Sequence, residues 1–171
     1  MNRTIDVCFS PDLIDTYDLE GKIVVIVDIL RATSCMVSGF ANGVKGIIPV
    51  ATLEECKEYQ NIGLICAAER GGKQVDGFEL DNSPFSYMKN NLEGKTICAT
   101  TTNGTLAISK STKAEKVIIG AFLNLSAVAT YLSSQPNDVI IHCAGWKGKV
   151  NMEDSLFAGA LIEKLQQGHT L

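Results

Sequence analysis

This sequence has few of the features that mark proteins of membranes, of nucleic acids or of the cell exterior. It contains no block rich in lysine and arginine, and its net charge is −4. No apolar stretch approaches the ~20 residues that a membrane-spanning helix needs, and residues 1–4 lack the apolar core of a signal peptide. We therefore expect a cytoplasmic protein with no nucleic-acid partner and no membrane partner. A homo-oligomer is compatible with this composition.

The six cysteines include no CxxC pair, and most of them lie within apolar runs. Paired spacings are typical of disulfide frameworks and of structural zinc sites, so their lack argues against both. The pattern instead predicts reduced, buried thiols. The cysteines stand at positions 8, 35, 56, 66, 98 and 143.

Three motifs of phosphate chemistry are also missing. No GxGxxG follows an expected strand, which disfavours a nucleotide-binding Rossmann domain. The threonine-rich segment 100–105 lacks the GK[ST] ending of a Walker A loop, so nucleoside-triphosphate hydrolysis of that type is not indicated. Haloacid-dehalogenase phosphatases need a second aspartate two residues after the first, and here Leu30 follows Asp28 at that spacing.

What the sequence does contain is a regular alternation of strand-like and helix-like segments. Apolar runs such as residues 22–29 are typical of strands buried on both faces, and Thr52-Leu53-Glu54-Glu55 is a capping box that begins a helix. This order predicts an α/β protein, a three-layer α/β/α arrangement with a largely parallel or mixed sheet. We expect strands at 4–9, 22–29, 46–50, 64–68, 95–99, 116–120 and 138–143, and helices at 32–41, 52–60, 84–90, 104–110, 124–133 and 152–167.

Polar clusters follow four of the expected strands. In an open parallel α/β sheet the carboxyl ends of the strands form the ligand crevice, so these clusters are expected to meet. Their acids, arginines, hydroxyls and glycines suit one site for an anionic ligand and a hard metal ion. The clusters are Asp28 with Arg31, Thr33 and Ser34; Glu69-Arg70-Gly71-Gly72; the residues 100–105; and Cys143-Ala144-Gly145 followed by Glu153 and Asp154.

The first cluster offers both a metal ligand and an anion clamp. Asp28, an acid at a strand end that faces a helix start, is a natural Mg²⁺ ligand or nucleophile. Arg31 can grip a phosphate or sulfonate with two parallel hydrogen bonds. Thr33 and Ser34 can bind the same anion together with the backbone N–H groups of the helix start. The alternative is purely local: Ser34 caps the helix while Asp28 and Arg31 form an ion pair.

The second and third clusters are loops that contain glycine. Glu69 is a candidate metal ligand or general base and Arg70 a second anion clamp, while Gly71 and Gly72 let the backbone approach a ligand closely. The hydroxyls and N–H groups of the third cluster can cradle a phosphate. Its candidate residues are Thr101, Thr102, Asn103, Gly104 and Thr105. The alternatives are a glycine-rich turn with solvated charges and a threonine-rich cap and turn.

The fourth cluster holds a cysteine and two acids. Cys143 is expected to be a packed thiol, because His142 should point to the opposite face of the strand and so cannot serve as its base. Asn151 is the expected cap of the last helix. Glu153 and Asp154, in the first turn, either complement the helix dipole or, for one of them, reach the metal.

Together these segments resemble the 2-phosphosulfolactate phosphatase family, the Mg²⁺-dependent phosphatases of coenzyme M biosynthesis. The resemblance extends over nearly the whole chain in the expected order, with Ala68 and Asp81 standing where glycine is expected. It implies a single α/β phosphatase-like domain over 1–171 that lacks the family's C-terminal portion. The matching segments are 27–34, 69–72, 77–78 with 82–84, 100–105, and 143–145 with 153–154.

The resemblance implies hydrolysis of the phosphate monoester of 2-phospho-3-sulfolactate, a small anionic substrate, or of a related phosphorylated hydroxy acid. The candidate Mg²⁺ ligands are then Asp28, Glu69 and Asp154, with Asp28 and either Glu69 or Asp154 holding the ion. These three acids, with Arg31 and Arg70, form the catalytic set. The nucleophile is either a Mg²⁺-bound water, with Glu69 or Asp154 as base, or Asp28 itself, which would form an aspartyl-phosphate. The alternative function is a non-catalytic binding module for a small phosphorylated metabolite.

Overall fold

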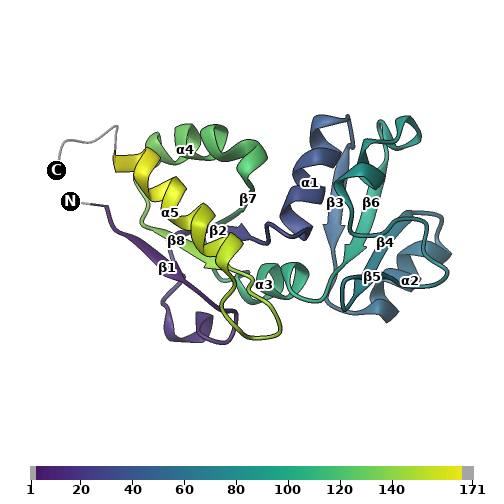
Figure 1. The fold of residues 1–171 in the computed structure, drawn as a ribbon, viewed down its shortest axis with the longest axis horizontal. Helices are drawn as coiled ribbons and strands as arrows, with labels where there is room; N and C mark the ends of the chain where they lie inside the picture. The colour runs from purple at the N-terminus through teal and green to yellow at the C-terminus, as the bar shows by residue number, and fades with distance from the viewer. Residues whose placement is uncertain (1–2, 167–171) are drawn as a thin grey trace.

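The computed structural model describes residues 3–166, and strands alternate with helices along them (Figure 1). This order confirms the predicted α/β class. The α-helices are α1 (Ala32–Ala41), α2 (Leu53–Asn61), α3 (Gly104–Lys110), α4 (Leu125–Ser133) and α5 (Met152–Gln166). The strands are β1 (Ile5–Cys8), β2 (Ile23–Val27), β3 (Gly46–Pro49), β4 (Ile65–Arg70), β5 (Lys73–Gln74), β6 (Thr96–Thr100), β7 (Lys116–Gly120) and β8 (Val139–Cys143). Short 3-10 turns form η1 (Ile14–Thr16), η2 (Pro84–Met88), η3 (Asn90–Leu92) and η4 (Phe122–Asn124).

The strands form two four-stranded sheets rather than one. Sheet A has the order β1-β8-β2-β7, and all its neighbouring strands are parallel. Sheet B has the order β3-β6-β4-β5, and within it only β5 is antiparallel to its neighbour. Sheet A lies on the left in Figure 1 and sheet B on the right. Sheet B is built from the chain between β2 and α3, so the chain crosses between the sheets after β2 and again after β6.

Sheet A is covered on both faces, which explains the unbroken apolar run of β2. Val25 packs with Phe157 of α5 in one core cluster, and Val24 packs with Ala107 of α3 in the other. Successive side chains of a strand point to opposite faces, so every residue of β2 is buried. Each fully buried valine or isoleucine side chain stabilises the fold by about 1.5–3 kcal/mol.

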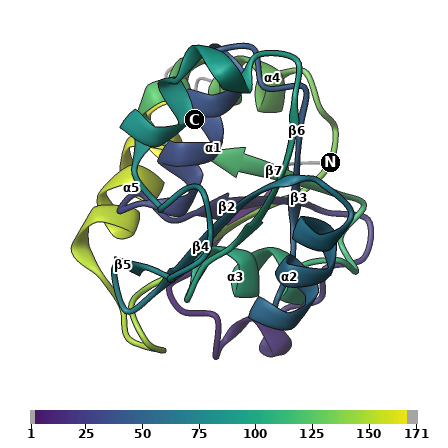
Figure 2. The same cartoon turned by 90° about the vertical axis from the view of Figure 1, so that its right-hand side faces the viewer.

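Sheet B has the same three layers, with α1 and α2 on its two sides (Figure 2). Ala67 and Ala99 belong to the core cluster that includes Cys35 of α1. Cys66 and Cys98, one residue earlier on the same strands, belong to the cluster that includes α2. The three-layer arrangement predicted from the sequence therefore occurs twice, once around each sheet.

Local expectations differ from the structure at one helix. The helix expected at 84–90 forms instead as the 3-10 turns η2 and η3, because Lys89 between them adopts an extended backbone (φ −79°, ψ 134°). The expected cap of the last helix is confirmed, since Asn151 Oδ1 accepts a hydrogen bond from Asp154 N at 3.3 Å. Residue 167 of the expected helix 152–167 lies outside the described residues. Within the described part of the chain, none of the helices combines the length and apolar character needed to cross a bilayer.

Candidate active site

The polar clusters meet where the chain crosses between the two sheets. The crossing after β2 carries Asp28 and Arg31, and the crossing after β6 carries Asn103. Arg31 Nη2 donates a hydrogen bond to the carbonyl oxygen of Gly72, 3.2 Å away in the turn between β4 and β5. Lys147 N donates to Asn103 Oδ1 at 3.1 Å and brings in the cluster that follows β8. The strand ends come together as the sequence predicted, although they belong to two sheets.

Asp28 lies at the centre of this meeting point and is only 5% exposed. Its Oδ1 accepts a hydrogen bond from Ala32 N at 3.2 Å. Burial, then the charge of Asp154 and that of Glu69, raises the pKa of Asp28 to about 7. The group therefore changes charge near neutral pH, as catalytic and cation-binding carboxylates often do.

The hydroxyls beside Asp28 hold the crossing in place. Thr33 Oγ1 donates to the carbonyl oxygen of Asp28 at 2.8 Å and accepts from Asp28 N at 3.0 Å. Ser34 Oγ donates to the carbonyl oxygen of Ile29 at 2.7 Å. Ser34 does not cap α1, as the alternative interpretation of this cluster proposed, because Arg31 is the N-cap and makes no side-chain cap bond. The amides of Ala32 and Thr33 also donate to Asp28, so neither they nor these hydroxyls are free for an anion at this helix start.

Glu69 and Arg70 tie the loops at the end of sheet B together. The Glu69 carboxylate, 4% exposed, accepts hydrogen bonds from Gly72 N and from both the N and Oγ1 atoms of Thr102, the latter two at 3.1 Å. Arg70 Nη2 donates to Thr100 Oγ1 at 2.9 Å, and Nη1 donates to the carbonyl oxygen of Glu69 at 2.7 Å. A guanidinium has five N–H donors, so Arg70 can bind an anion while it keeps these contacts.

The threonine-rich loop is a closed turn. Thr105 Oγ1 accepts from Thr101 N at 3.1 Å and donates to the carbonyl oxygen of Thr101 at 2.9 Å. Thr101 Oγ1 accepts from Thr105 N at 3.2 Å. These two buried threonines therefore act as turn-and-cap residues, the alternative that the sequence left open. The amides of Thr101, Thr102 and Thr105 and the Thr102 hydroxyl already donate within the protein, so an anion would have to replace these contacts to be cradled by the loop.

Gly104 is where the two crossings touch. A Cβ atom at this position would lie 2.5 Å from Ala32 Cβ and 2.7 Å from Asp28 Oδ2. No side chain fits in that space without moving the start of α1 or the Asp28 carboxylate. The glycine is therefore required for close approach of the backbone rather than for a positive φ.

Asp154 acts as a clamp between strand ends. It is fully buried, its Oδ1 accepts from Ile29 N at 2.8 Å and its Oδ2 accepts from Gly145 N at 3.0 Å. Burial raises its pKa. Because each carboxylate oxygen already binds a backbone amide, Asp154 joins the first turn of α5 to the ends of β2 and β8.

The three predicted metal ligands do not converge on one point. Within residues 3–166, the only three side chains whose potential donor atoms all lie within 4.8 Å of one another are cysteines. Asp28, Glu69 and Asp154 therefore do not form a closed cage of three carboxylates, and binding of Mg²⁺ by Asp28 with Glu69 or Asp154 stays a prediction. The arrangement is compatible with a Mg²⁺ ion held by one or two carboxylates, because Mg²⁺ commonly completes its shell with water and substrate phosphate.

Cys143 is a packed thiol, as predicted. Its side chain is fully buried beside Phe157 in a core cluster of sheet A, and burial raises its pKa to about 12. His142 points to the opposite face of β8, where its Nδ1 lies 2.9 Å from Ser111 Oγ. His142 therefore cannot act as a base for the Cys143 thiol.

Sequence reasoning missed the backbone amides that hold the acids. Asp154 binds the amides of Ile29 and Gly145, and Gly145 adopts a positive φ of 61°. The adjacent Lys147, with φ 51°, presents its amide to Asn103. The glycine in the strand-end cluster Cys143-Ala144-Gly145 was the signal that could have indicated such a turn.

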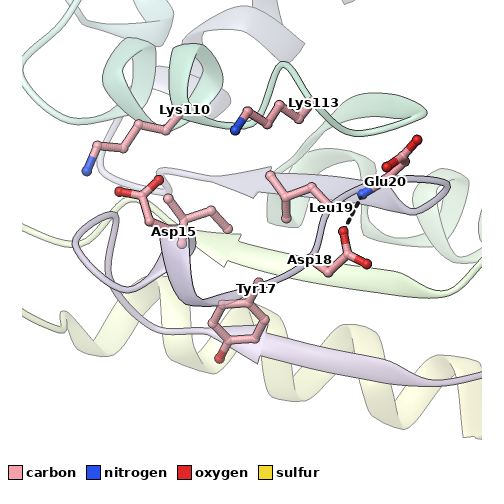
Figure 3. A pocket seen from close by; sticks show the side chains of 8 residues that line it. Asp15, Tyr17, Asp18, Leu19, Glu20, Lys110 and Lys113 are labelled. Carbon is pink, nitrogen blue, oxygen red and sulfur yellow. Dashed lines mark hydrogen bonds between the residues drawn. The ribbon is translucent and has the colours of Figure 1, made fainter.

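A surface hollow lies away from this site (Figure 3). Lys110 and Lys113 border one side of it and Asp15, Asp18 and Glu20 the other. The Asp18 carboxylate accepts a hydrogen bond from Glu20 N at 3.2 Å. The hollow mixes both signs of charge and includes none of the predicted site residues, so the candidate site remains the crossing of the two sheets.

The fold and the site define an α/β protein whose candidate site combines buried carboxylates, two guanidinium groups and a helix start. A family model described as 2-phosphosulpholactate phosphatase matches residues 8–171. The chain belongs to the 2-phosphosulfolactate phosphatase family.

Curated relatives support the same family. A protein from Caldanaerobacter subterraneus subsp. tengcongensis is 45% identical over 157 residues, which cover 90% of this chain and 65% of the relative. A Thermotoga maritima protein is 42% identical over 163 residues, 95% of this chain and 69% of the relative. A Clostridium perfringens protein is 40% identical over 167 residues, which cover 94% of this chain and 68% of the relative. All three are named "Probable 2-phosphosulfolactate phosphatase". The chain spans about two thirds of their length.

Proposed function

We propose that this chain carries the active site of a Mg²⁺-dependent phosphatase that hydrolyses 2-phospho-3-sulfolactate, or a related phosphorylated hydroxy acid, to the hydroxy acid and phosphate. The name shared by the relatives supports the substrate. The observation that carries the proposal is the buried Asp28 carboxylate, which lies at the sheet crossing with Arg31, Glu69 and Arg70. We infer a cytoplasmic role in coenzyme M biosynthesis, and the six free thiols suit a reducing compartment.

Mg²⁺ fits the charges of this site. Burial and two neighbouring acids disfavour the ionised form of Asp28, and a divalent cation would offset that repulsion. Asp28, with Glu69 or Asp154, would hold the ion. Both oxygens of Glu69 and both oxygens of Asp154 already accept hydrogen bonds, so either carboxylate would bind the ion through a remaining lone pair. When bound, Mg²⁺ supplies neutralisation of the charge on the phosphate oxygens.

The two guanidinium groups suit a substrate with two anionic ends. Arg31 stands at the start of α1, where its guanidinium can bind the phosphate. Arg70, on the other side of the crossing at the end of β4, can bind the sulfonate or carboxylate. Hydrolysis of a phosphate monoester needs on the order of 20 kcal/mol of barrier reduction, which positioning and charge neutralisation must supply.

Two routes remain for the attack on phosphorus. In one, an Asp28 oxygen bonds to phosphorus, the P–O bond to the hydroxy acid breaks, and the hydroxy acid leaves after its oxygen takes a proton from solvent. Water then hydrolyses the aspartyl-phosphate and releases phosphate. In the other, water attacks directly while Glu69 takes its proton. Trapping a phosphorylated peptide that contains Asp28 would support the first route. Direct transfer of ¹⁸O from water to phosphate, without an enzyme-bound intermediate, would support the second.

Replacing the phosphate clamp should abolish most of the activity. Arg31→Ala is expected to lower kcat/KM by about 100-fold or more, because one charged donor to the reacting phosphate is lost. Cys143→Ala, which alters a packed thiol, should change kcat/KM far less. Phosphate release is measured with Mg²⁺ and with EDTA, on 2-phospho-3-sulfolactate and a panel of phosphorylated hydroxy acids.

The outcomes separate the two candidate functions. Metal-dependent release that is selective for the sulfonated substrate supports the reaction and the substrate. Binding of the phosphorylated acids without release, in this chain and in a longer form of the protein, would favour the non-catalytic binding module. A Cys143→Ala variant without activity, beside an active Arg31→Ala variant, would show that the site is misassigned.

A further inference from the structure

Three cysteines gather outside the candidate active site. Cys56 lies on α2, Cys66 on β4 and Cys98 on β6, and their three Sγ atoms all lie within 4.8 Å of one another. All three residues have no exposed surface. Spacings of ten and thirty-two residues, with no CxxC pair, hide this group from sequence reasoning, and only the pairing of β4 with β6 brings it together.

The surroundings of this cysteine triad are apolar. Its core cluster also contains Ala68 of β4 and Phe78 of the segment that follows β5. Partly buried apolar side chains pack around this cluster. Burial raises the pKa of Cys66 to about 12. The neighbouring Cys98 thiol, and then burial, raise the pKa of Cys56, and the opposing effect of Arg70 is smaller. The Cys56 and Cys66 thiols are therefore neutral in the free protein.

Charge decides which occupant such a site accepts. Three thiolates around a monovalent or divalent ion leave a net negative charge, and an unpaired charge costs several kcal/mol in an apolar interior. A trivalent centre leaves no net charge. Soft, thiol-seeking trivalent elements are the class that matches both the ligand set and its surroundings.

The geometry also suits one central atom. A point between three sulfur atoms no more than 4.8 Å apart lies within about 2.8 Å of each, close to the ~2.3 Å of a metal–thiolate bond. Small rotations of the three cysteine side chains would bring the sulfur atoms to the bonding distance. Since one sulfur comes from α2 and two from adjacent strands, an occupant would cross-link α2 to sheet B.

We propose that Cys56, Cys66 and Cys98 form a binding site for trivalent arsenic, or for antimony of the same charge. Arsenous acid, As(OH)₃, reacts with three thiols to give a neutral As(S–Cys)₃ centre and three waters. Three As–O bonds break and three As–S bonds form. Each thiol proton leaves with a hydroxide as water, and nothing is oxidised or reduced.

The test uses the full chain with arsenous acid as the probe. The protein is unfolded, refolded with arsenite so that burial cannot block entry, and freed of excess arsenite. Native mass spectrometry is expected to show one arsenic atom gained and three hydrogens lost. Arsenic X-ray absorption should show three sulfur neighbours and no oxygen, and the cross-link should raise the Tm of the wild-type chain.

Matched variants locate the site. Cys98→Ala removes one ligand and should lose tight retention of arsenic, whereas Cys8→Ala removes a buried thiol elsewhere and should retain it. If Cys98→Ala fails to fold, the absorption spectrum of the wild-type chain still decides. A centre with an oxygen neighbour, equal retention by both variants, or tighter binding of Cd²⁺ than of arsenous acid would overturn the proposal.

Discussion

At the scale of single residues, Gly104 determines how closely the two crossings between the sheets approach each other. A Cβ atom there would meet Ala32 Cβ and Asp28 Oδ2. Gly104→Ala is therefore expected to destabilise the fold by about 1–3 kcal/mol through overpacking. It should also lower phosphate release, because Asp28 must move. Urea unfolding and a phosphate assay measure the two effects.

The matched control is Gly159→Ala on α5. A Cβ atom at Gly159 meets nothing within 4 Å, so alanine should be neutral or stabilise the helix by up to about 1 kcal/mol. Equal effects of the two substitutions would contradict the role of Gly104 as a contact between crossings.

The raised pKa of Asp28 has a consequence for stability. Its pKa is about 7 in the fold against 3.8 for an ordinary aspartate, so the folded state holds the extra proton between these values. The contribution of this group to stability is therefore largest below its unfolded pKa of 3.8, and it falls by about 4 kcal/mol as the pH rises to about 7. Asp28→Asn should remove this fall, and its gain in stability over the wild type should grow with pH.

Urea midpoints between pH 5 and pH 8, with EDTA present, measure this difference. Asp76, which is exposed, offers the control, because the difference in stability between Asp76→Asn and the wild type should not change with pH. If the difference in stability between Asp28→Asn and the wild type did not change with pH either, the raised pKa of the buried Asp28 would be contradicted. The same variant should lack phosphatase activity, so a gain in stability would accompany a loss of function.

At the scale of elements, Asp154 fastens the first turn of α5 to the ends of β2 and β8. An asparagine has one acceptor oxygen and would turn an N–H₂ group toward a backbone N–H of Ile29 or Gly145. Asp154→Asn should therefore cost about 1–3 kcal/mol, the usual cost of an unsatisfied buried donor. Thermal and urea unfolding of the variant provide the measurement.

Glu153→Gln tests whether this cost comes from the clamp. Glu153 stands in the same helical turn but is only partly buried, so its substitution should change stability by no more than about 0.5 kcal/mol. Similar losses for both variants would assign the effect to the helix dipole instead. Because the Asp154 charge raises the pKa of Asp28, Asp154→Asn should also lower that pKa.

At the scale of the whole molecule, the candidate site lies at the contact between two separate sheets. A ligand bound there holds both sheets, so it should stabilise the whole fold. Inorganic phosphate with Mg²⁺, at about 100 times its Kd, should add about 2.7 kcal/mol and raise Tm by roughly 5–10 °C. Differential scanning calorimetry with phosphate alone, Mg²⁺ alone and both together measures this shift.

Arg31→Ala serves as the comparison for this shift. The variant lacks the phosphate clamp that reaches from α1 to Gly72 and should lose most of the increase. An undiminished increase would place phosphate binding elsewhere on the molecule. Two separate melting transitions, with only one of them moved by the ligand, would show that the site does not join the sheets.

Much of this architecture was predictable because its causes are local. The apolar run of β2 follows from burial on both faces, and the capping box at Thr52 is present as read, with Glu55 N bonded to Thr52 Oγ1 at 3.1 Å. The packed state of Cys143 followed from strand alternation alone. Local patterns fail at Lys89, where an extended residue replaces an expected helical turn.

The sequence by itself determined the alternation of elements, the polar clusters at strand ends and the family. Each of these depends on residues close together in the chain, through strand periodicity, helix capping and contiguous motifs. Only the tertiary structure decided that the strands divide into two sheets, that Asp154 binds backbone amides, and that Cys56, Cys66 and Cys98 meet. Those features depend on which strands pair across long separations, and that choice is made by packing of the whole molecule rather than by any local pattern.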